Sequence, residues 1–562
     1  MRIVIDMQGA QTESRFRGIG RYTLSFAKAV ARNRGEHEIF LALNGMFPQS
    51  IEAIREAFAD LLPRENIRVW HAQGPASHRH PENEPRRKIA EIMREAFLQS
   101  LSPDIIHVCS LFEGFSDDGV TSIGRFDQIT PVSVILYDLI PLLNPEHFFS
   151  KNPAYKVFYD NRLADLERAT AFLSISEHSR LEGIKYLDVR AAQITTISAA
   201  IEPYFKPIEI TKNVKNDLLN KFKLTRSFVL YTGGADDHKN LPRLIKAYAR
   251  LPLELRQSHH LVFAGKMPMG NMEIFKRAAK SAGLGPDDLC FTGYISDEEL
   301  RQLYNLCELY VFPSWYEGFG LPALEAMACG APVLASNAAS LPEVIGLEAA
   351  LFDPFDVSSM SSKISKALED SDFKKTLQTH GLKRAREFSW DKIATGAIAA
   401  WEAIPLRDKK TYSAQSQLED RLYRALAPRA TKLAATSRMT LAGNIALNQQ
   451  AGVQRQLFID ISELSQRDAG TGVQRVVRSY LECLLQSPPK DFRVQPVYAT
   501  LDHGYFYARA YTQQFLRDGN SGVYDTPVQW QRGDIFFALD MQHHVQLKHH
   551  AFYQKLRQDG VR

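Results

Sequence analysis

Short apolar runs rich in β-branched and aromatic residues alternate with longer amphipathic stretches throughout residues 1–404. Alternation of this kind indicates β–α–β units, in which helices cover a parallel sheet. A first series of runs comprises Arg2–Asp6, Glu38–Leu43, Ile67–Trp70, Asp104–Val108, Pro131–Tyr137 and Ala171–Ile175. A second comprises Phe228–Thr232, Leu261–Gly265, Leu289–Gly293, Leu309–Ser314, Val333–Ser336 and Ala350–Asp353. We therefore predict an α/β protein with two doubly wound domains, residues 1–205 and 206–404, that face a cleft.

Two helix starts in the second domain are marked by their residue types. Ser296 with Glu299, and Ser340 with Glu343, have the spacing of a capping box. In that motif the hydroxyl and the carboxylate bind the free amides at the beginning of a helix. Both pairs are therefore predicted to be local helix caps.

Residues 405–455 differ from the two predicted domains. They hold nine Lys or Arg against three Asp or Glu, and no strand-like run. This composition predicts a basic, partly helical linker, in which Pro428 weakens any single amphipathic helix. We favour a solvated tether, and contact with anionic lipid head groups is the alternative.

Residues 456–562 begin as the chain itself begins. Gln456–Leu485 parallels Ile3–Val30, because each has an apolar strand ending in Asp, then a glycine-containing loop, an arginine and an amphipathic helix. The repeat is about half of one α/β domain, and an open half-sheet leaves apolar faces and strand edges uncovered. We predict an incomplete second module, which is either part of a longer tandem protein or poorly ordered.

Composition limits the partners and the compartment. The formal charge is +4 over 562 residues, too small for the basic stripe of a nucleic-acid binder. Five cysteines without metal-ligand spacing are typical of free thiols in a reducing compartment. No secretory signal and no apolar run long enough to span a membrane is evident. We expect a cytoplasmic protein that can also be peripheral at the inner face of the membrane.

The segment Phe312–Ser336 is the most informative for function. Glu317 follows a predicted buried strand, Gly318 and Gly320 come next, and a helix begins near Pro322. Free amides and the positive end of the helix dipole favour phosphate there. Glu317 and Glu325 flank this helix start, and carboxylates accept hydrogen bonds from sugar hydroxyls. The arrangement suits a nucleotide sugar, with diphosphate between ribose and hexose.

A lysine in another loop has the charge that such a ligand requires. Lys239 follows the strand Phe228–Thr232 and a glycine-rich turn, and it directly precedes a helix. A cation there can neutralise a departing diphosphate. Gly18 and Gly20 also follow a strand and open a helix, although a tight turn alone explains such glycines.

With its seven-residue spacing, the Glu317–Glu325 pair resembles the signature of the family 4 retaining glycosyltransferases of GT-B fold, over residues 1–404. The resemblance implies two Rossmann-like domains and no metal ion. It assigns the donor sugar to Glu317, the ribose to Glu325 and the phosphate to Lys239. It also places donor contacts at the amides of Gly318, Phe319 and Gly320, at the base-reading loop with Gly293 and Tyr294, and at the loop with Gly18 and Gly20.

Departures from the family pattern are also visible. Many members have an arginine upstream of the lysine, where this chain has Gly234 and Ala235, so the second cation is in doubt. His238 can serve only if protonated, and we interpret it as a surface histidine. Relatives often have a histidine where this chain has Tyr137, directly before Asp138, a candidate catalytic residue. This variant resembles surface-polysaccharide enzymes, often mannosyltransferases.

Several residues have ordinary structural explanations. Asp6, Arg17 and Arg21 are given even odds of reaching donor or acceptor, while His107 is interpreted as a core residue. Asp370 and Asp372 match a metal-binding spacing, but a solvated helix end explains them better. The helix from Phe388 to Ile404 resembles the family segment that crosses back to the first domain.

The sequence thus predicts a retaining glycosyltransferase without a cofactor. Its donor would be a nucleotide sugar, with GDP-mannose resting on the subgroup resemblance. Its acceptor would be a glycan or a polyprenyl-linked glycan in O-antigen or other surface-polysaccharide synthesis. The alternatives are an inactive glycan- or partner-binding scaffold and, on the same fold, a nucleotide-sugar epimerase or a phosphorylase.

Overall fold

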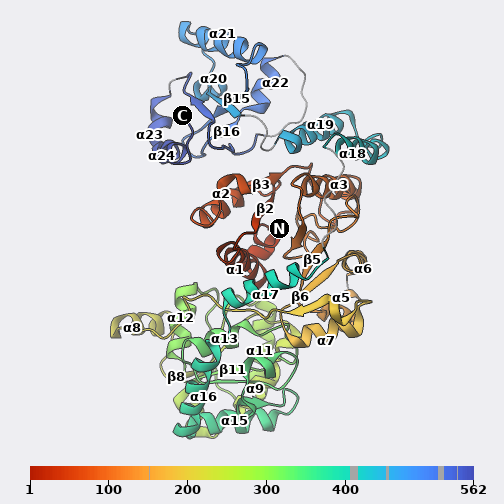
Figure 1. Cartoon of the computed structure of the whole chain (residues 1–562). Helices are drawn as coiled ribbons and strands as arrows, with labels where there is room; N and C mark the ends of the chain where they lie inside the picture. The colour runs from red at the N-terminus through yellow and green to blue at the C-terminus, as the bar shows by residue number, and fades with distance from the viewer. Residues whose placement is uncertain (151, 406–414, 451–454, 517–524, 541) are drawn as a thin grey trace.

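The computed structural model describes residues 1–150, 152–405, 415–450, 455–516, 525–540 and 542–562. Figure 1 shows the first domain in the middle of the molecule, the second domain on one side of it and the C-terminal unit on the other. Helices line the faces of both main sheets. The GT-B prediction of two Rossmann-like domains with a further α/β unit is confirmed.

The first domain is built on a seven-stranded sheet in the order β3-β2-β1-β4-β5-β6-β7, and every neighbouring pair is parallel. Its helices are α1 (Gly18–Arg32), α2 (Pro48–Ala57), α3 (Glu84–Ser100), α4 (Ile140–Leu143), α5 (Pro145–Phe149), α6 (Pro153–Leu166) and α7 (Glu177–Tyr186). Its strands are β1 (Arg2–Asp6), β2 (Glu38–Asn44), β3 (Ile67–Trp70), β4 (Ile105–Val108), β5 (Val132–Leu136), β6 (Ala171–Ser174) and the unpredicted β7 (Ile194–Thr196).

The second domain has a six-stranded parallel sheet in the order β10-β9-β8-β11-β12-β13. Its strands are β8 (Ser227–Thr232), β9 (His259–Ala264), β10 (Leu289–Phe291), β11 (Leu309–Phe312), β12 (Val333–Ser336) and β13 (Leu351–Phe352). Its helices are α8 (Lys212–Lys221), α9 (Leu241–Ala249), α10 (Leu253–Ser258), α11 (Met269–Ser281), α12 (Asp297–Leu306), α13 (Leu321–Ala328), α14 (Leu341–Ile345), α15 (Val357–Glu369) and α16 (Ser371–Ala385).

Helix α17 (Trp390–Glu402) follows the second domain in sequence but packs on α1 of the first. The indole Nε1 of Trp401 donates to Ser133 Oγ in β5 at 3.0 Å, and the ring of Trp390 meets Tyr22 edge-on. His107 lies in this core, where its Nδ1 is 3.2 Å from the same Ser133 hydroxyl. The predicted crossing helix and the predicted core histidine are both found.

The linker is partly helical, as predicted, but the favoured interpretation as a solvated tether was wrong. Residues 415–450 form two helices, α18 (Gln415–Ala430) and α19 (Ala435–Gln450), rather than a solvated tether. Leu418, Leu422 and Leu426 of α18 are buried against α3. Pro428 lies in the last turn of α18, where the helix ends two residues later. The alternative, contact of the basic side chains with anionic lipid head groups, stays a prediction.

The C-terminal unit is folded where the structure describes it, so the prediction of poor order was wrong there. Its sheet has the order β16-β15-β14-β17. The strands are β14 (Arg455–Asp460), β15 (Phe492–Tyr498), β16 (Phe506–Tyr507) and β17 (Ile535–Phe537), and the helices are α20 (Ser462–Gln466), α21 (Gly472–Gln486), α22 (Arg509–Phe515), α23 (His543–Lys548) and α24 (His550–Gln558).

The internal repeat is confirmed in three dimensions. β14 pairs in parallel with β15 and β17, as β1 pairs with β2 and β4. The backbone N–H of Arg2 donates to Asp104 at 2.7 Å, and that of Gln456 donates to Asp534 at 2.7 Å. Both aspartates directly precede the fourth strand of their unit, so the two units share the arrangement of their three central strands. They differ at the edge, where β16 runs antiparallel to β15 and β3 runs parallel to β2.

Among the described residues, no helix combines the length and the apolar character that a bilayer crossing requires.

Candidate active site

The loop after β11 begins the second-domain side of the site. Gly320 has φ of 107° at the N-cap of α13, a left-handed conformation that favours glycine. A Cβ atom at Gly320 would also lie 2.5 Å from Leu341 Cδ2, so a side chain would not fit. Pro322 occupies the first turn of α13, as predicted. The loop therefore brings backbone amides close to the positive end of the helix dipole.

Lys239 and Glu317 are in direct contact. Lys239 Nζ lies 2.7 Å from Glu317 Oε1, and the two side chains are 17% and 12% exposed. Lys239 ends a 3₁₀ turn after β8, and the next residue, Asn240, is left-handed and buried. The Asn240 amide donates to the carbonyls of Pro313 and Pro354 at 3.0 and 2.7 Å, which ties this turn to the Glu317 loop.

The first domain contributes Asp138 from the loop after β5. A Cβ atom on Gly318 would lie 3.1 Å from Asp138 Oδ2 and 3.0 Å from the carbonyl oxygen of Tyr137, so the two domains touch here. Burial raises the pKa of Asp138 to about 6, and the negative charge of Glu317 adds to the rise. The backbone N–H of Ile140, which donates to Asp138, opposes it. The structure thus brings Asp138, Glu317 and Lys239 into one place.

Glu325 faces the other side of the α13 start. The Tyr304 hydroxyl donates to Glu325 Oε2 at 3.0 Å and lies 2.9 Å from the Thr232 hydroxyl. Burial raises the pKa of Glu325 to about 7, and the nearby positive charge of Arg21 opposes the rise. Tyr304 is a contact that the sequence analysis did not identify, because nothing local marks a tyrosine twenty-one residues from its partner.

The first turn of α1 approaches from the first domain. Arg21 forms an ion pair with Asp297 of α12, which crosses between the domains. A Cβ on Gly20 would lie 2.3 Å from Arg15 Cα, so close packing with the preceding turn requires this glycine. Gly18 is exposed with open space around its Cα. Donor contact by Gly18 and Gly20 stays a prediction.

Asp6 has a structural role. Its carboxylate forms a buried ion pair with Arg94 of α3 and accepts the backbone N–H of Gln8 at 3.1 Å. Asp460 accepts the N–H of Ser462 at 3.0 Å in the repeat. The Asp6 carboxylate therefore fixes the loop after β1 and does not bind the donor or the acceptor.

One of the two predicted capping boxes was wrong. Ser296 and Glu299 cap α12 reciprocally, as expected. Ser340 instead donates to the carbonyls of Glu317 and Phe319, both at 2.9 Å. Glu343 accepts two backbone N–H groups at the start of α7 in the first domain, those of residues 177 and 178, at 2.9 and 3.2 Å. The tertiary partners outcompete the local cap, and the sequence signal does not distinguish the two cases.

A second polar contact between the domains lies nearby. The Tyr316 hydroxyl donates to Glu182 of α7, and His178 Nε2 lies 3.1 Å from the same carboxylate. Hydrogen bonding to Glu182 raises the pKa of His178. These three residues join the loop that carries Glu317 to the first domain, and the sequence analysis had singled out none of them.

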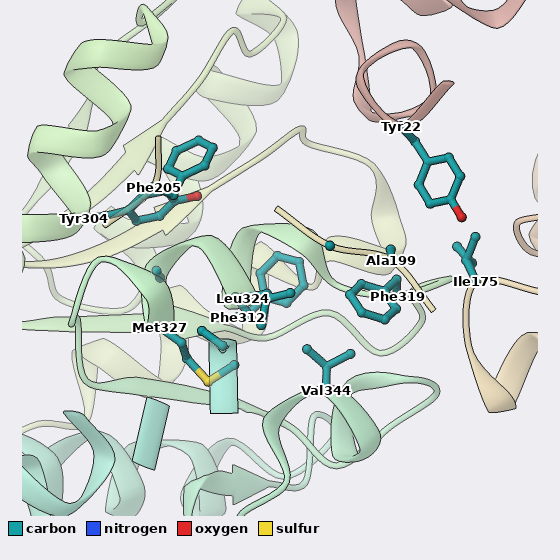
Figure 2. Close-up of a cluster of buried hydrophobic side chains, with 14 of the residues drawn as sticks. Tyr22, Ile175, Ala199, Phe205, Tyr304, Phe312, Phe319, Leu324, Met327 and Val344 are labelled. Atoms are coloured by element: carbon teal, nitrogen blue, oxygen red, sulfur yellow. The ribbon is translucent and has the colours of Figure 1, made fainter. Parts of the chain in front are cut away.

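Phe319 contributes its backbone to the site and its side chain to the core. Figure 2 shows Phe319 near Ala199 and Val344, with Ile175 and Tyr22 of the first domain beyond it. These side chains belong to one buried cluster that continues through both domains. Phe319 also meets the ring of Phe388 edge-on at 5.6 Å. The apolar cluster holds the Glu317–Gly320 loop in place, and the polar atoms of that loop stay at the interface between the two domains.

The remaining predicted residues lie outside the contacts described above. Gly293 is left-handed and Tyr294 is 78% exposed, so their reading of a base stays a prediction. Burial, followed by the charge of Lys239, lowers the pKa of His238, which makes it unsuited to be the second cation. Asp370 caps α16 with its side chain, as predicted. Within the described residues no group of three or more His, Cys, Asp or Glu has metal-binding geometry.

Comparison with known proteins gives the family. Residues 216–384 match the family model of Glycosyl transferases group 1, a range that includes Lys239, Glu317 and Glu325. The second domain matches the group 1 glycosyltransferase family over these residues. HepE of Anabaena, solved with UDP and glucose, aligns with a TM-score of 0.52 at 18% identity and covers 72% of this chain and 100% of its own. Sucrose-phosphate synthase of Thermosynechococcus elongatus gives 0.51 at 20%, covering 72% and 98%.

The chain is also similar to curated mannosyltransferases. The serotype-specific mannosyltransferase WbdA of Escherichia coli is 38% identical over 546 residues, which are 97% of this chain and 65% of the relative. O-antigen chain mannosyltransferase B of Escherichia coli is 34% identical over 240 residues, 42% of this chain and 62% of the relative. The chain thus spans about two thirds of the length of WbdA.

Proposed function

We propose that residues 1–404 transfer mannose from GDP-mannose to a glycan with retention of anomeric configuration, in O-antigen synthesis. The observation that carries this proposal is the convergence of Lys239, Glu317 and Asp138 at the domain interface, 2.7 Å separating the first two. The similarity of this chain to mannosyltransferases supports mannose, rather than another hexose, as the transferred sugar. The base, GDP rather than UDP, rests on that likeness.

In this mechanism the acceptor hydroxyl attacks the anomeric carbon as the nucleoside diphosphate leaves from the same face. The C–O bond to phosphate breaks, and the new glycosidic C–O bond forms. Lys239 and the amides of the Gly318–Gly320 loop stabilise the charge that develops on the leaving phosphate oxygen. That oxygen takes the proton of the acceptor hydroxyl. Glu317 orients the sugar by accepting hydrogen bonds from its hydroxyls.

Asp138 has a different task in the proposed reaction. With a pKa of about 6, its carboxyl is mostly ionised at neutral pH but still available to exchange a proton. Its position beside Gly318 supports a role at the sugar rather than at the base. We propose that it positions the transferred sugar and the acceptor hydroxyl, while Glu325 holds the ribose.

The proposal is tested with the purified full chain and a panel of nucleotide sugars. GDP-mannose with an oligomannoside acceptor is expected to yield an α-linked product, and Glu317→Ala is expected to lower the rate at least a hundredfold. EDTA should leave the rate unchanged, because the charges are supplied by Lys239 and amides. Loss of activity in EDTA would contradict the metal-independent mechanism.

The alternatives give other outcomes in the same assay. A scaffold with an inactive site would bind neither GDP- nor UDP-sugars tightly in calorimetry and would release no nucleotide. An epimerase would change the sugar without an acceptor. Turnover by the Glu317→Ala variant at the wild-type rate would contradict our placement of the sugar. Action in the cytoplasm, at the inner face of the membrane, remains a proposal that the assay does not address.

A further inference from the structure

A cavity of about 660 Å³ lies between the first domain, α19 and the C-terminal unit. The first domain lines it with the loops that follow β2 and β3, including His71, and with Asp118. The C-terminal unit lines it with β15 and α22, including Arg493 and Arg509. Its volume is within the range of small-molecule sites in proteins. No residue of the Lys239–Glu317 site lines this cavity.

The walls of the cavity are joined by specific contacts. The backbone N–H of His71 donates to Asn448 Oδ1 of α19 at 2.7 Å, and the Asn448 amide donates to the carbonyl of His71 at 3.0 Å. On the same side of the first domain, the guanidinium of Arg64 stacks over the Trp530 ring at 3.6 Å. The cavity is therefore built from three parts of the chain that hold one another.

The chemistry of the lining suits hydroxyl groups. Arg493 is half-buried, and its guanidinium makes no hydrogen bond or ion pair with the residues that the structure describes. Asp118 Oδ1 accepts the N–H of Ala76 at 2.6 Å, which leaves its other oxygen available as an acceptor. Burial, followed by the charge of Arg509, lowers the pKa of His71 to about 3, so this imidazole is neutral.

The charges of the lining balance one another. Arg493 and Arg509 are matched in number by Asp118 and Asp525. A neutral ligand rich in hydroxyls would use both the arginines and the aspartates, because each hydroxyl can accept a hydrogen bond from a cation and donate one to a carboxylate. An anion would instead require an excess of cations. The lining thus favours a carbohydrate.

The cavity and the Asp138 loop lie at the same edge of the first sheet. All seven strands are parallel, and the loops after β2, β3 and β5 leave from their carboxyl ends. From β5 to β3 there are four strand spacings, or about 19 Å. Between them, the loops after β1 and β4 are polar and joined, since the N–H of Glu13 donates to Asp117 at 2.9 Å and Ser116 Oγ donates to Glu13 at 3.1 Å.

We propose that this cavity binds the acceptor oligosaccharide several sugar residues away from its reacting end. The chain of sugars would follow the carboxyl edge of the first sheet from Asp138 to Arg493. The inference rests on the proposed function for its ligand and assigns to the C-terminal unit a part in acceptor binding. Longer acceptors would then be held more tightly than short ones.

The test is calorimetry on the full chain with α-linked mannobiose and mannohexaose as probes. We expect mannohexaose to bind about tenfold more tightly than mannobiose, the scale of hydrogen bonds to a charged group. Arg493→Ala should remove this gain, Arg493→Lys should retain part of it, and Arg557→Ala, an exposed arginine on α24, should leave it intact. The affinity for GDP should not change in any variant.

A second variant guards against loss of folding. Ala446→Phe fills the cavity from α19 without altering Arg493, and it should also remove the gain while thermal melting stays within a few degrees of wild type. Equal binding of both probes by the wild type, or an intact gain in Arg493→Ala, would overturn the proposal. Arg493-dependent binding of inorganic phosphate without a length effect would assign the cavity to an anion and overturn it too.

The two proposals fail separately. The binding measurement requires no donor, so it gives an answer even if no nucleotide sugar is turned over. Conversely, transfer from GDP-mannose with no preference for longer acceptors would leave the proposed function standing and reject the cavity as an acceptor site.

Discussion

Lys239 Nζ lies 2.7 Å from Glu317 Oε1, so the predicted phosphate cation and the predicted sugar carboxylate form one ion pair. An ammonium group has three donors and can keep Glu317 while it adds a phosphate oxygen. The pair therefore holds both side chains in fixed positions, and its two charges offset each other.

Removing Lys239 should weaken the binding of the nucleoside diphosphate. Lys239→Ala is expected to raise the Kd for GDP about 10- to 100-fold, because a charge-assisted hydrogen bond contributes about 1.5–3 kcal/mol. Calorimetric titration measures it, with Lys280→Ala on the exposed face of α11 as the control. Unchanged affinity in Lys239→Ala would contradict the assignment of this lysine to phosphate.

Donor affinity should rise with pH around neutrality. Glu325 has a raised pKa of about 7, so it is mostly protonated at pH 6 and mostly ionised at pH 8. The ionised form accepts hydrogen bonds from both ribose hydroxyls, and so the Kd for GDP should fall between these values. The nucleotide phosphate also titrates in this window, so the control is Glu325→Gln, which should show a flatter profile.

Tyr304→Phe refines the same test. The Tyr304 hydroxyl donates to Glu325 and favours its ionised form. Its removal should shift the rise in affinity to higher pH. A profile that keeps its midpoint in Tyr304→Phe, or that is identical in wild type and Glu325→Gln, would remove Glu325 from the ribose site.

The cap that Glu343 provides to α7 should contribute to closure of the domains. Glu343→Ala removes the acceptor of two amides at a helix N-terminus and is expected to lower the free energy of unfolding by about 1 kcal/mol. The same loss of free energy weakens the contact between the two domains, so the closed form is less populated and the KM for the donor should rise about fivefold. Urea denaturation and steady-state kinetics measure the two effects.

The matched control for Glu343 is Glu348→Ala. Glu348 is exposed in the 3₁₀ turn that follows α14. It should leave both stability and KM unchanged. A purely local role for Glu343 would appear as reduced stability with a normal KM.

The two glycines in the first turn of α1 should differ on substitution. Gly20→Ala places a Cβ 2.3 Å from Arg15 Cα, and the forced shift should lower stability by about 1–3 kcal/mol. Gly18→Ala meets open space and should melt like wild type. If this turn contacts the donor phosphate, Gly18→Ala should nevertheless raise the KM for the donor. A normal KM in this stable variant would remove the turn from the donor site.

The sheets could be predicted from the sequence because their strands are buried on both faces. Ile67–Trp70 and Val333–Ser336 were predicted with their observed bounds. β7 was missed because its three residues, Ile194–Thr196, include two threonines and one buried side chain. Short edge strands carry little apolar pattern, so their existence depends on the neighbour with which they pair.

The site could be predicted where a motif is local, and not where its partners are distant. Glu317, Gly320 and Glu325 lie on one loop and helix, so the spacing of the acids indicated their arrangement. Glu343 had a local signal that predicted the wrong partner, because its acceptor atoms are used in the other domain. Such long-range contacts depend on how the domains meet, which periodicity does not encode.

Helix α17 carries a mechanical consequence. Its chain comes from the second domain, yet its side chains are anchored in the first by Trp401 and by the ion pair between Asp391 and Arg32. A swing of one domain away from the other would part Glu343 from α7 while α17 stays seated. The two domains would then rotate about α17, and substrates would enter on the side where Glu343 separates from α7.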